Sequence, residues 1–260
     1  MLRRIFLVFF SLLLWISGVW GTNIAIASPL ESRLANYPQW QNKPPVKAAR
    51  GDLYYPEWLA GTWDATSTLI EQTAPLAPEI VTPGFEDNQR NIGNPFEFSV
   101  RFGKDYFIPE KSLLAKFQSQ TPQVVADRVY NGTNIAKAYL GANNVLRVQT
   151  DPENPNKQIT LLKGDRTLSS QVTARASENL EDNRFIASEV TKQLFRSPDR
   201  IYLNEVETTS DYHLVNSQTI KATQITAIYL SPQDPDYFRA SDRPVAIYRY
   251  QLDLNKHLNK

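Results

Sequence analysis

The chain has 260 residues, a formal net charge of +1 and no cysteine. The absence of cysteine excludes disulfides, thiol catalysis, thioether attachment of a chromophore and cysteine-based metal sites. The near-neutral charge argues against nucleic acid and against tight binding to anionic lipid, because both need a basic surface. Of the two histidines, His257 lies three residues from the C-terminus, which leaves only His213 for a catalytic triad or metal site. We therefore expect no metal and no cofactor.

Residues 1–27 have the features of a secretory signal peptide. Arg3 and Arg4 give the positive start, an uncharged run follows from Ile5 to Trp20, and Ala25-Ile26-Ala27 matches the small-x-small cleavage pattern. The run is shorter than the ~20 residues of a membrane-spanning helix, which favours a cleaved signal over the alternative, an uncleaved membrane anchor. Cleavage near Ala27/Ser28 removes the two arginines, leaving 26 Lys+Arg against 27 Asp+Glu in an exported chain long enough for one β domain.

Residues 28–56 contain five prolines, too many for regular secondary structure. The segment also carries Tyr37, Trp40, Tyr54 and Tyr55, and these aromatic residues favour docking across the domain over a free tail. We predict an irregular Pro-rich N-terminal segment over residues 28–56.

From Trp58 onward the dominant signal is β, because segments rich in Val, Ile, Thr, Phe and Tyr recur between turn residues. The best helix is Thr133–Leu140, with Asn131 as its N-cap. The predicted strands are Gly61–Gln72, Phe96–Phe107, Val124–Tyr130, Val145–Gln149, Gln158–Lys163, Thr167–Ser177, Arg184–Arg196, Arg200–Thr209, Tyr212–Val215, Ser217–Leu230 and Pro244–Leu254.

Several of these strands alternate between apolar and polar residues, as Phe96–Phe102 does throughout. This period of two leaves one face buried and one wet, which antiparallel sheets tolerate. With about ten such strands and little helix, closing the sheet on itself removes exposed edges. We therefore predict an all-β domain over residues 57–256: a single antiparallel β-barrel with a short helix and a long Pro-rich loop. That loop, from Thr73 to Pro95, is either a lid over the barrel mouth or a strap on the outside wall.

Gly61-Thr62-Trp63 opens the first long strand. A Gly-x-Trp at this position resembles the calycin superfamily, which includes lipocalins and fatty-acid-binding proteins; the alternative is a tryptophan in an ordinary core. The resemblance implies that Trp63 plugs the closed end of the barrel and that Arg249, in the last strand, stacks on it. The chain departs from these families because Tyr250 directly follows Arg249 where fatty-acid-binding proteins have Arg-x-Tyr, and because it lacks a helical lid pair after the first strand and a disulfide.

A closer resemblance covers most of the chain after residue 27. The segments 55–63, 75–85 and 244–250 look like an uncharacterised family of cyanobacteria and plastids. This resemblance implies a photosynthetic host and a location in the thylakoid lumen or periplasm. It brings no catalytic residues with it.

Polar side chains inside the strands are candidates for fixing a ligand in a cavity. Glu189 and Gln193 share one face of their strand, and Gln224 lies on an otherwise apolar face. If Arg101 and Glu205 face the same cavity, the group forms a charged, hydrogen-bonding cluster.

Buried charges persist only when they are paired, so an arginine, Arg101 or Arg249, is expected opposite a glutamate. In the alternative, the carboxylates face water on the outer wall, which is the expected position of Glu207. The candidate ligand-binding residues are Trp63, Arg101, Glu189, Gln193, Glu205, Gln224, Tyr248 and Arg249.

These features favour a non-catalytic, monomeric binding protein for an apolar or amphipathic small molecule such as a pigment, quinone or lipid-like compound. One alternative is a ligand-free accessory factor that contacts a membrane complex through the Pro-rich loop. Another is an isomerase or lyase acting on a tetrapyrrole or isoprenoid, with Glu189 or Glu205 as the base. A large cavity lined by strand side chains would favour the binding protein over the ligand-free accessory factor. The enzyme also needs a carboxylate inside that cavity.

Overall fold

The computed structural model describes residues 27–104 and 123–258. The predicted signal sequence therefore lies, apart from Ala27, outside the described residues, as does the end of the predicted strand Phe96–Phe107. None of the helices in the described ranges has the length and apolar character needed to cross a membrane.

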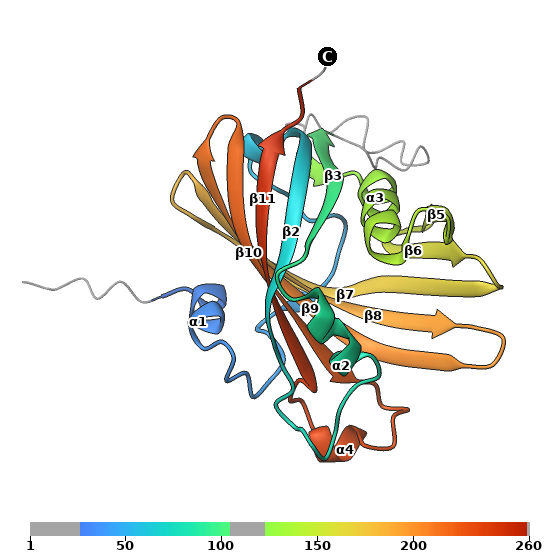
Figure 1. Cartoon of the computed structure of the whole chain (residues 1–260). Helices are drawn as coiled ribbons and strands as arrows, with labels where there is room; N and C mark the ends of the chain where they lie inside the picture. Colours follow the sequence, from blue (N-terminus) through green and yellow to red (C-terminus); the bar gives the residue numbers. More distant parts are fainter. Residues whose placement is uncertain (1–26, 105–122, 259–260) are drawn as a thin grey trace, which may run out of the picture.

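The described chain is mainly antiparallel β with a few short helices (Figure 1). Ten strands form one sheet in the order β4-β3-β2-β11-β10-β9-β8-β7-β6-β5, and the short β1 (Lys47–Ala48) pairs with β7. The ten strands are β2 (Gly61–Thr73), β3 (Pro95–Lys104), β4 (Val124–Ala126), β5 (Val145–Asp151), β6 (Asn154–Leu162), β7 (Arg166–Leu180), β8 (Arg184–Arg196), β9 (Ile201–Asn216), β10 (Thr219–Leu230) and β11 (Ala246–Lys256). The helices are α1 (Pro29–Ala35), α2 (Phe85–Asn88), α3 (Arg128–Leu140) and α4 (Tyr237–Ala240), with short 3-10 turns at Glu57–Leu59 and Gln89–Asn91.

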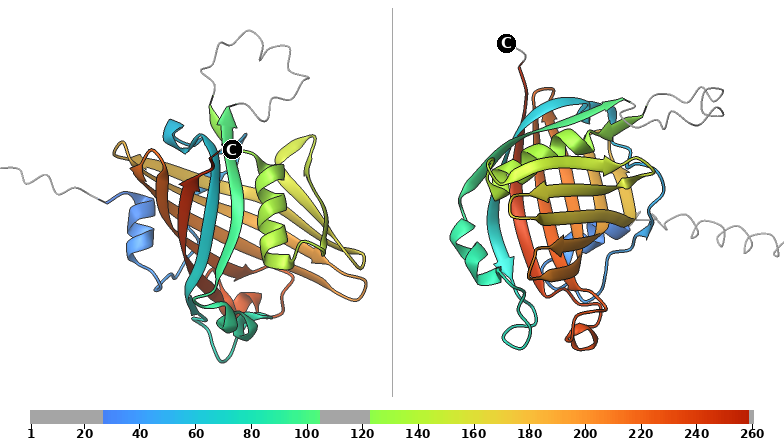
Figure 2. Two further views of the ribbon diagram at one scale, coloured as in Figure 1. Left: turned by 45° about the horizontal axis from the view of Figure 1, so that its top comes forward. Right: turned by 90° about the vertical axis from the view of Figure 1, so that its right-hand side faces the viewer.

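The sheet curls into a half-barrel, which confirms the predicted all-β antiparallel fold. Its two edges, β4 and β5, are not paired with each other, and α3 connects them in the chain. Figure 2 shows α3 lying beside β3 at the opening between the edges. A helix therefore occupies the place where a closed barrel would continue its strand pairing.

Side chains of α3 satisfy backbone groups on the edge of β3. The side chain of Asn131 accepts a hydrogen bond from Arg101 N at 2.6 Å and donates one to Arg101 O at 3.1 Å. Asn134 donates to Ser99 O at 3.2 Å. These bonds replace part of a strand ladder and leave less of the β3 edge open to pairing with another chain.

The prediction of a strand over Val124–Tyr130 is wrong in its second half. Asp127 ends β4 and caps the helix, since its Oδ1 accepts from Tyr130 N at 3.0 Å. The predicted N-cap, Asn131, lies inside α3, where its amide binds the sheet edge instead. Asp127 is a preferred N-cap residue, and α3 therefore begins a turn earlier than predicted.

The first part of the N-terminal segment packs on the convex face of the half-barrel. The prediction that residues 28–56 are irregular is wrong at α1 and at β1. Ser28 caps α1 and also binds Glu178 of β7. Trp40 is 2% exposed and packs on Ile225 and Ile247 of the convex face. Trp40 and α1 together cover apolar surface on the convex face that would otherwise be exposed to solvent.

Under this segment lies a buried ion pair between Arg33 and Glu207. Glu207 was expected to face water, but its side chain is 0% exposed because α1 covers it. Arg33 donates two hydrogen bonds to the Glu207 carboxylate, at 2.7 and 2.6 Å, and stacks on Trp40 at 3.9 Å. Tyr229 donates to Glu207 Oε2 at 2.7 Å. Thr209 also donates to Glu207 Oε1, at 2.9 Å. The charge of Glu207 is thus satisfied by three partners, which explains how it tolerates burial.

The phenol of Tyr229 is expected to stay protonated in the native protein at about pH 11. Burial raises the pKa of Tyr229 above its ordinary value, and the neighbouring Glu207 carboxylate raises it further. A pKa raised in the folded state contributes stability below the unfolded value of about 10, and this contribution is lost as the pH rises above it. After a rapid jump to about pH 11, Tyr229→Phe should therefore leave the tyrosinate absorbance of the native protein unchanged. In urea the same variant should show one tyrosinate fewer than the unsubstituted protein; a loss already in the native state would contradict the prediction.

The Pro-rich loop closes the end of the half-barrel at β10 and β11. Leu76 and Ile80 pack against Leu230 and Val245, and α4 lies beside them. Further along, Phe85 packs on Tyr248. Of the two alternatives for this loop, the structure excludes the strap on the outside wall, because the apolar residues of the loop pack against side chains on the concave side of the strands. The loop is thus an end plug.

Candidate functional site

Two adjoining cavities lie between the concave face and α3, with volumes of about 290 and 510 Å³. They form one hollow, because seven residues line both. Ile135 and Tyr139 of α3 face it and are each 38% exposed, so the helix spans the hollow without packing tightly on the sheet. The shared residues are Tyr55, Ala126, Asn131, Ile135, Tyr139, Glu189 and Thr208.

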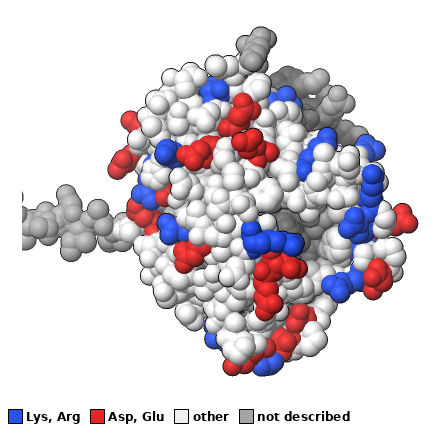
Figure 3. Space-filling model, in the orientation of Figure 1, with Lys and Arg blue, Asp and Glu red and all other residues white. Residues whose placement is uncertain are grey.

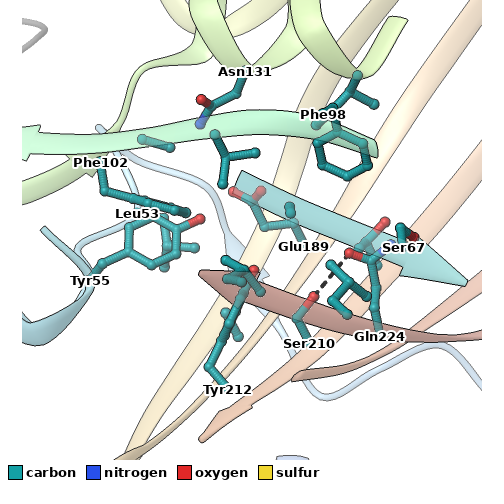
Figure 4. A pocket seen from close by; sticks show the side chains of 18 of the residues that line it. Leu53, Tyr55, Ser67, Phe98, Phe102, Asn131, Glu189, Ser210, Tyr212 and Gln224 are labelled. Atoms are coloured by element: carbon teal, nitrogen blue, oxygen red, sulfur yellow. Dashed lines mark hydrogen bonds between the residues drawn. The ribbon is translucent and has the colours of Figure 1, made fainter. Parts of the chain in front are cut away.

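The smaller cavity is largely apolar. Side chains from β2, β3 and β11 line it, and Tyr55, beside Phe102, and Tyr212 also face it (Figure 4). Tyr55 packs its ring on Phe102 at 4.8 Å and on Phe185 at 5.6 Å. Burial raises the pKa of Tyr55 well above its ordinary value, and the nearby Tyr212 and Glu189 raise it further. The phenol is therefore a neutral donor at physiological pH.

Polar groups of the smaller cavity are mostly bonded to one another. Ser210 donates to Gln224 Oε1 at 3.4 Å, the contact drawn in Figure 4. Tyr139 donates to Ser67 Oγ at 2.9 Å. This internal bonding lets polar residues lie beside an apolar ligand without the cost of unsatisfied groups.

Glu189 lies at the junction of the two cavities and is held between two arginines. Its Oε1 is 3.0 Å from Arg175 Nη2 and 3.9 Å from Arg128 Nη2. Oε1 accepts no well-aligned hydrogen bond. Its contact with Arg175 is therefore an ion pair, close enough for attraction between the charges but without hydrogen-bond geometry. Arg128 in turn donates to Asp52 at 3.1 Å. Two carboxylates and two guanidinium groups compensate one another, so the cluster adds no net charge to the hollow.

The larger cavity has a polar floor. Its strand residues include amide and hydroxyl side chains, while Leu168 and Val172 supply apolar surface between them. The polar side chains of the floor are Asn156, Gln158, Thr160, Ser170, Thr191 and Gln193. The hollow thus changes from an apolar end to a polar end.

Three of the predicted site residues line the hollow: Glu189, Gln193 and Gln224. Trp63 lies beside it in the core cluster, 0% exposed, with its Nε1–H donating to Leu59 O at 2.8 Å. Arg249 was predicted to stack on Trp63, and this is wrong. The cation over the indole ring is Lys256, whose Nζ lies 4.3 Å from the ring centroid. Gly61 has a φ of +125°, a backbone conformation that residues with a side chain rarely adopt, which accounts for glycine there.

The other four predicted residues lie elsewhere. Arg249 faces the convex side over Tyr37, at 5.4 Å, and Glu205 is on the same side, paired with Lys43. Arg101 lies on the outer side of β3 and binds Asp127. Tyr248 is on the concave side but packs under the end plug and lines neither cavity. Arg101 and Arg249 both point away from the hollow, so the arginines that lie beside Glu189 are Arg128 and Arg175 and not the two that were expected opposite a glutamate.

Sequence reasoning missed several residues of the hollow. Arg128 was placed in a strand, and Arg175 changes face at an irregularity in the β7–β8 register between Val172 and Ala174. Tyr55 comes from the N-terminal segment, where only its aromatic character signalled burial. Among the described residues, His, Cys, Asp and Glu side chains form no group that could hold a metal ion.

Basic and acidic side chains are interspersed on the face drawn in Figure 3. No broad area of one sign is visible on that face. The surface seen there therefore offers no obvious electrostatic guide to a highly charged partner.

Comparison with protein families places residues 47–258 in a domain of unknown function, DUF6816. No curated protein matches the chain, and no solved structure matches it. The matched region begins at β1 and includes every strand of the half-barrel and all residues around the hollow from Leu53 onward. The chain therefore belongs to the DUF6816 family, a family of uncharacterised proteins.

Proposed function

We propose that this protein binds a small amphipathic molecule in the hollow under α3. The observation that carries the proposal is a cavity with an apolar end and a polar end on the concave face of a curled sheet. Ligand sites span roughly 300–1,000 Å³ and combine apolar walls with a few polar groups. The larger cavity falls within this range and the smaller lies at its lower end.

The proposal includes a calycin-like origin of the half-barrel and action outside the cytoplasm. Gly61-Thr62-Trp63 begins β2, and Trp63 is buried at the base of the core, as the resemblance implies. The leader over residues 1–27 supports export, and the similar segments support the thylakoid lumen or periplasm of a photosynthetic organism. A pigment, a quinone or a lipid-like compound is the proposed class of ligand.

A neutral fluorescent probe, N-phenyl-1-naphthylamine, tests the hollow directly. Its emission should rise on binding to the native protein, and Ala126→Phe should weaken binding about tenfold or more, since Ala126 lines both cavities and a phenyl ring would occupy them. Ala138→Phe is the matched control, because Ala138 is on α3 and lines neither cavity. Circular dichroism should confirm that both variants are folded.

Two results would contradict the proposal. One is a native protein that leaves the emission of the probe unchanged. The other is a folded Ala126→Phe variant that binds the probe as tightly as the unsubstituted protein does.

A further inference from the structure

Three polar side chains form a row across the floor of the larger cavity. Gln158 of β6 is the register partner of Ser170 of β7, and Ser170 is the register partner of Gln193 of β8. All three line the larger cavity, and Thr191 lies two residues from Gln193 on the same face. Since neighbouring strands are about 4.8 Å apart, the row presents two amides and a hydroxyl across about 10 Å of the floor.

The row has hydrogen-bonding capacity that the protein does not use. Within residues 27–104 and 123–258, the side chains of Gln158, Ser170, Thr191 and Gln193 make no hydrogen bond, although each is half-buried. Asn131, by contrast, uses both ends of its amide on the backbone of Arg101. A carboxamide both donates and accepts, as does a hydroxyl, so the row matches a ligand group that carries several hydroxyls.

The charges around the hollow point to a neutral ligand. Among the residues that the structure describes, Glu189 and Arg128 are the charged ones that line the two cavities. Both are already paired, with Arg175 and Asp52 completing the cluster. A charged head group would lose hydration on entering and would find no unpaired counter-charge among these residues. A neutral head group avoids this cost.

We propose that the ligand is a neutral amphiphile with a hydroxyl-rich head group, such as a single glycosyl unit on an apolar chain. The head group lies on the row of Gln158, Ser170 and Gln193, and the apolar chain extends past Glu189 into the smaller cavity. This inference rests on the proposed function, because it assigns the chemical class of the molecule that the hollow takes.

Displacement of N-phenyl-1-naphthylamine by three amphiphiles with the same chain tests the head group. Octyl glucoside, octanoate and octylammonium are compared below their micelle-forming concentrations. Octyl glucoside should displace the probe at a concentration at least about tenfold lower than either charged compound. Free glucose should not displace it, because glucose lacks the chain; displacement by glucose would overturn the assignment to an amphiphile.

The outcomes separate the two proposals. If the probe does not bind the native protein, the proposed function fails. If the probe binds but octanoate or octylammonium displaces it as well as octyl glucoside does, the hollow remains a binding site and only the neutral, hydroxyl-rich head group is overturned.

Gln193→Leu tests the row itself, with a side chain of similar size that cannot form hydrogen bonds. It should weaken the binding of octyl glucoside about 3- to 10-fold, the effect of losing one neutral hydrogen bond. The matched control is Gln171→Leu, since Gln171 follows Ser170 on β7, is exposed and lines neither cavity. Undiminished binding of octyl glucoside by Gln193→Leu would overturn the role of the row.

Discussion

Replacing Arg33 with methionine is expected to lower the free energy of unfolding by about 3–5 kcal/mol, the range for breaking a buried ion pair from one side. The side chain of Glu207 is 0% exposed and that of Arg33 is 9% exposed, so removal of the guanidinium leaves a carboxylate under α1 without a counter-charge. The hydrogen bonds from Tyr229 and Thr209 remain but cannot neutralise this charge. Urea titration followed by circular dichroism measures the loss.

Two variants test whether burial is the cause. Adding Glu207→Gln to Arg33→Met removes the stranded charge and keeps an acceptor for Tyr229, so the double variant should recover much of the loss. Lys43→Met breaks the pair with Glu205, in which Lys43 is 33% exposed, and should cost no more than about 1 kcal/mol. Equal losses for Arg33→Met and Lys43→Met would contradict the buried pair.

Trp63→Ala is expected to cost about 3–5 kcal/mol of unfolding free energy, because it empties the largest fully buried side chain of the core. Trp63 packs in the cluster that joins β2, β3, β8 and β11, so the void would lie where both halves of the sheet meet. Thermal or urea unfolding of the variant gives the value.

Trp63→Phe keeps a ring in this position and provides the matched comparison. It loses the 2.8 Å hydrogen bond to Leu59 O and part of the indole surface, and should therefore cost less than half as much as alanine. A loss below about 1 kcal/mol for Trp63→Ala would show that the indole does not hold this end of the core together.

Alternation along the strands predicted much of the concave face. Glu189 and Gln193 were assigned to one face of β8 and both line the hollow, and the bounds of that strand, Arg184–Arg196, are those of the structure. The burial of Trp63 also followed from its place at the start of the first long strand. These predictions were possible because the alternation of apolar and polar residues along a strand depends only on residues that are close in sequence.

What the patterns could not supply is which strand lies beside which, and what covers each face. Glu205 and Glu207 lie two residues apart and so share one face of β9, yet nothing local shows that this face is convex and covered by the N-terminal segment. Arg175 reaches Glu189 because the register shifts between Val172 and Ala174, and such a shift reverses the alternation along the strand. The opening between β4 and β5 could not be predicted for a similar reason, since no local pattern shows that α3 rather than another strand lies there.

The pairing of β2 with β11 affects the order in which the strands of the sheet can pair during folding. Strands β5 to β11 follow one another as successive neighbours, so their pairing needs only nearby sequence. Strand β2 instead finds its partner near the opposite end of the polypeptide, where Trp63 is matched with Lys256. During synthesis, β2 and β3 therefore cannot join the sheet until β11 has been made, and until then their apolar residues stay exposed to solvent. Truncation of β11 would leave β2 and β3 without the strand that joins them to the rest of the sheet.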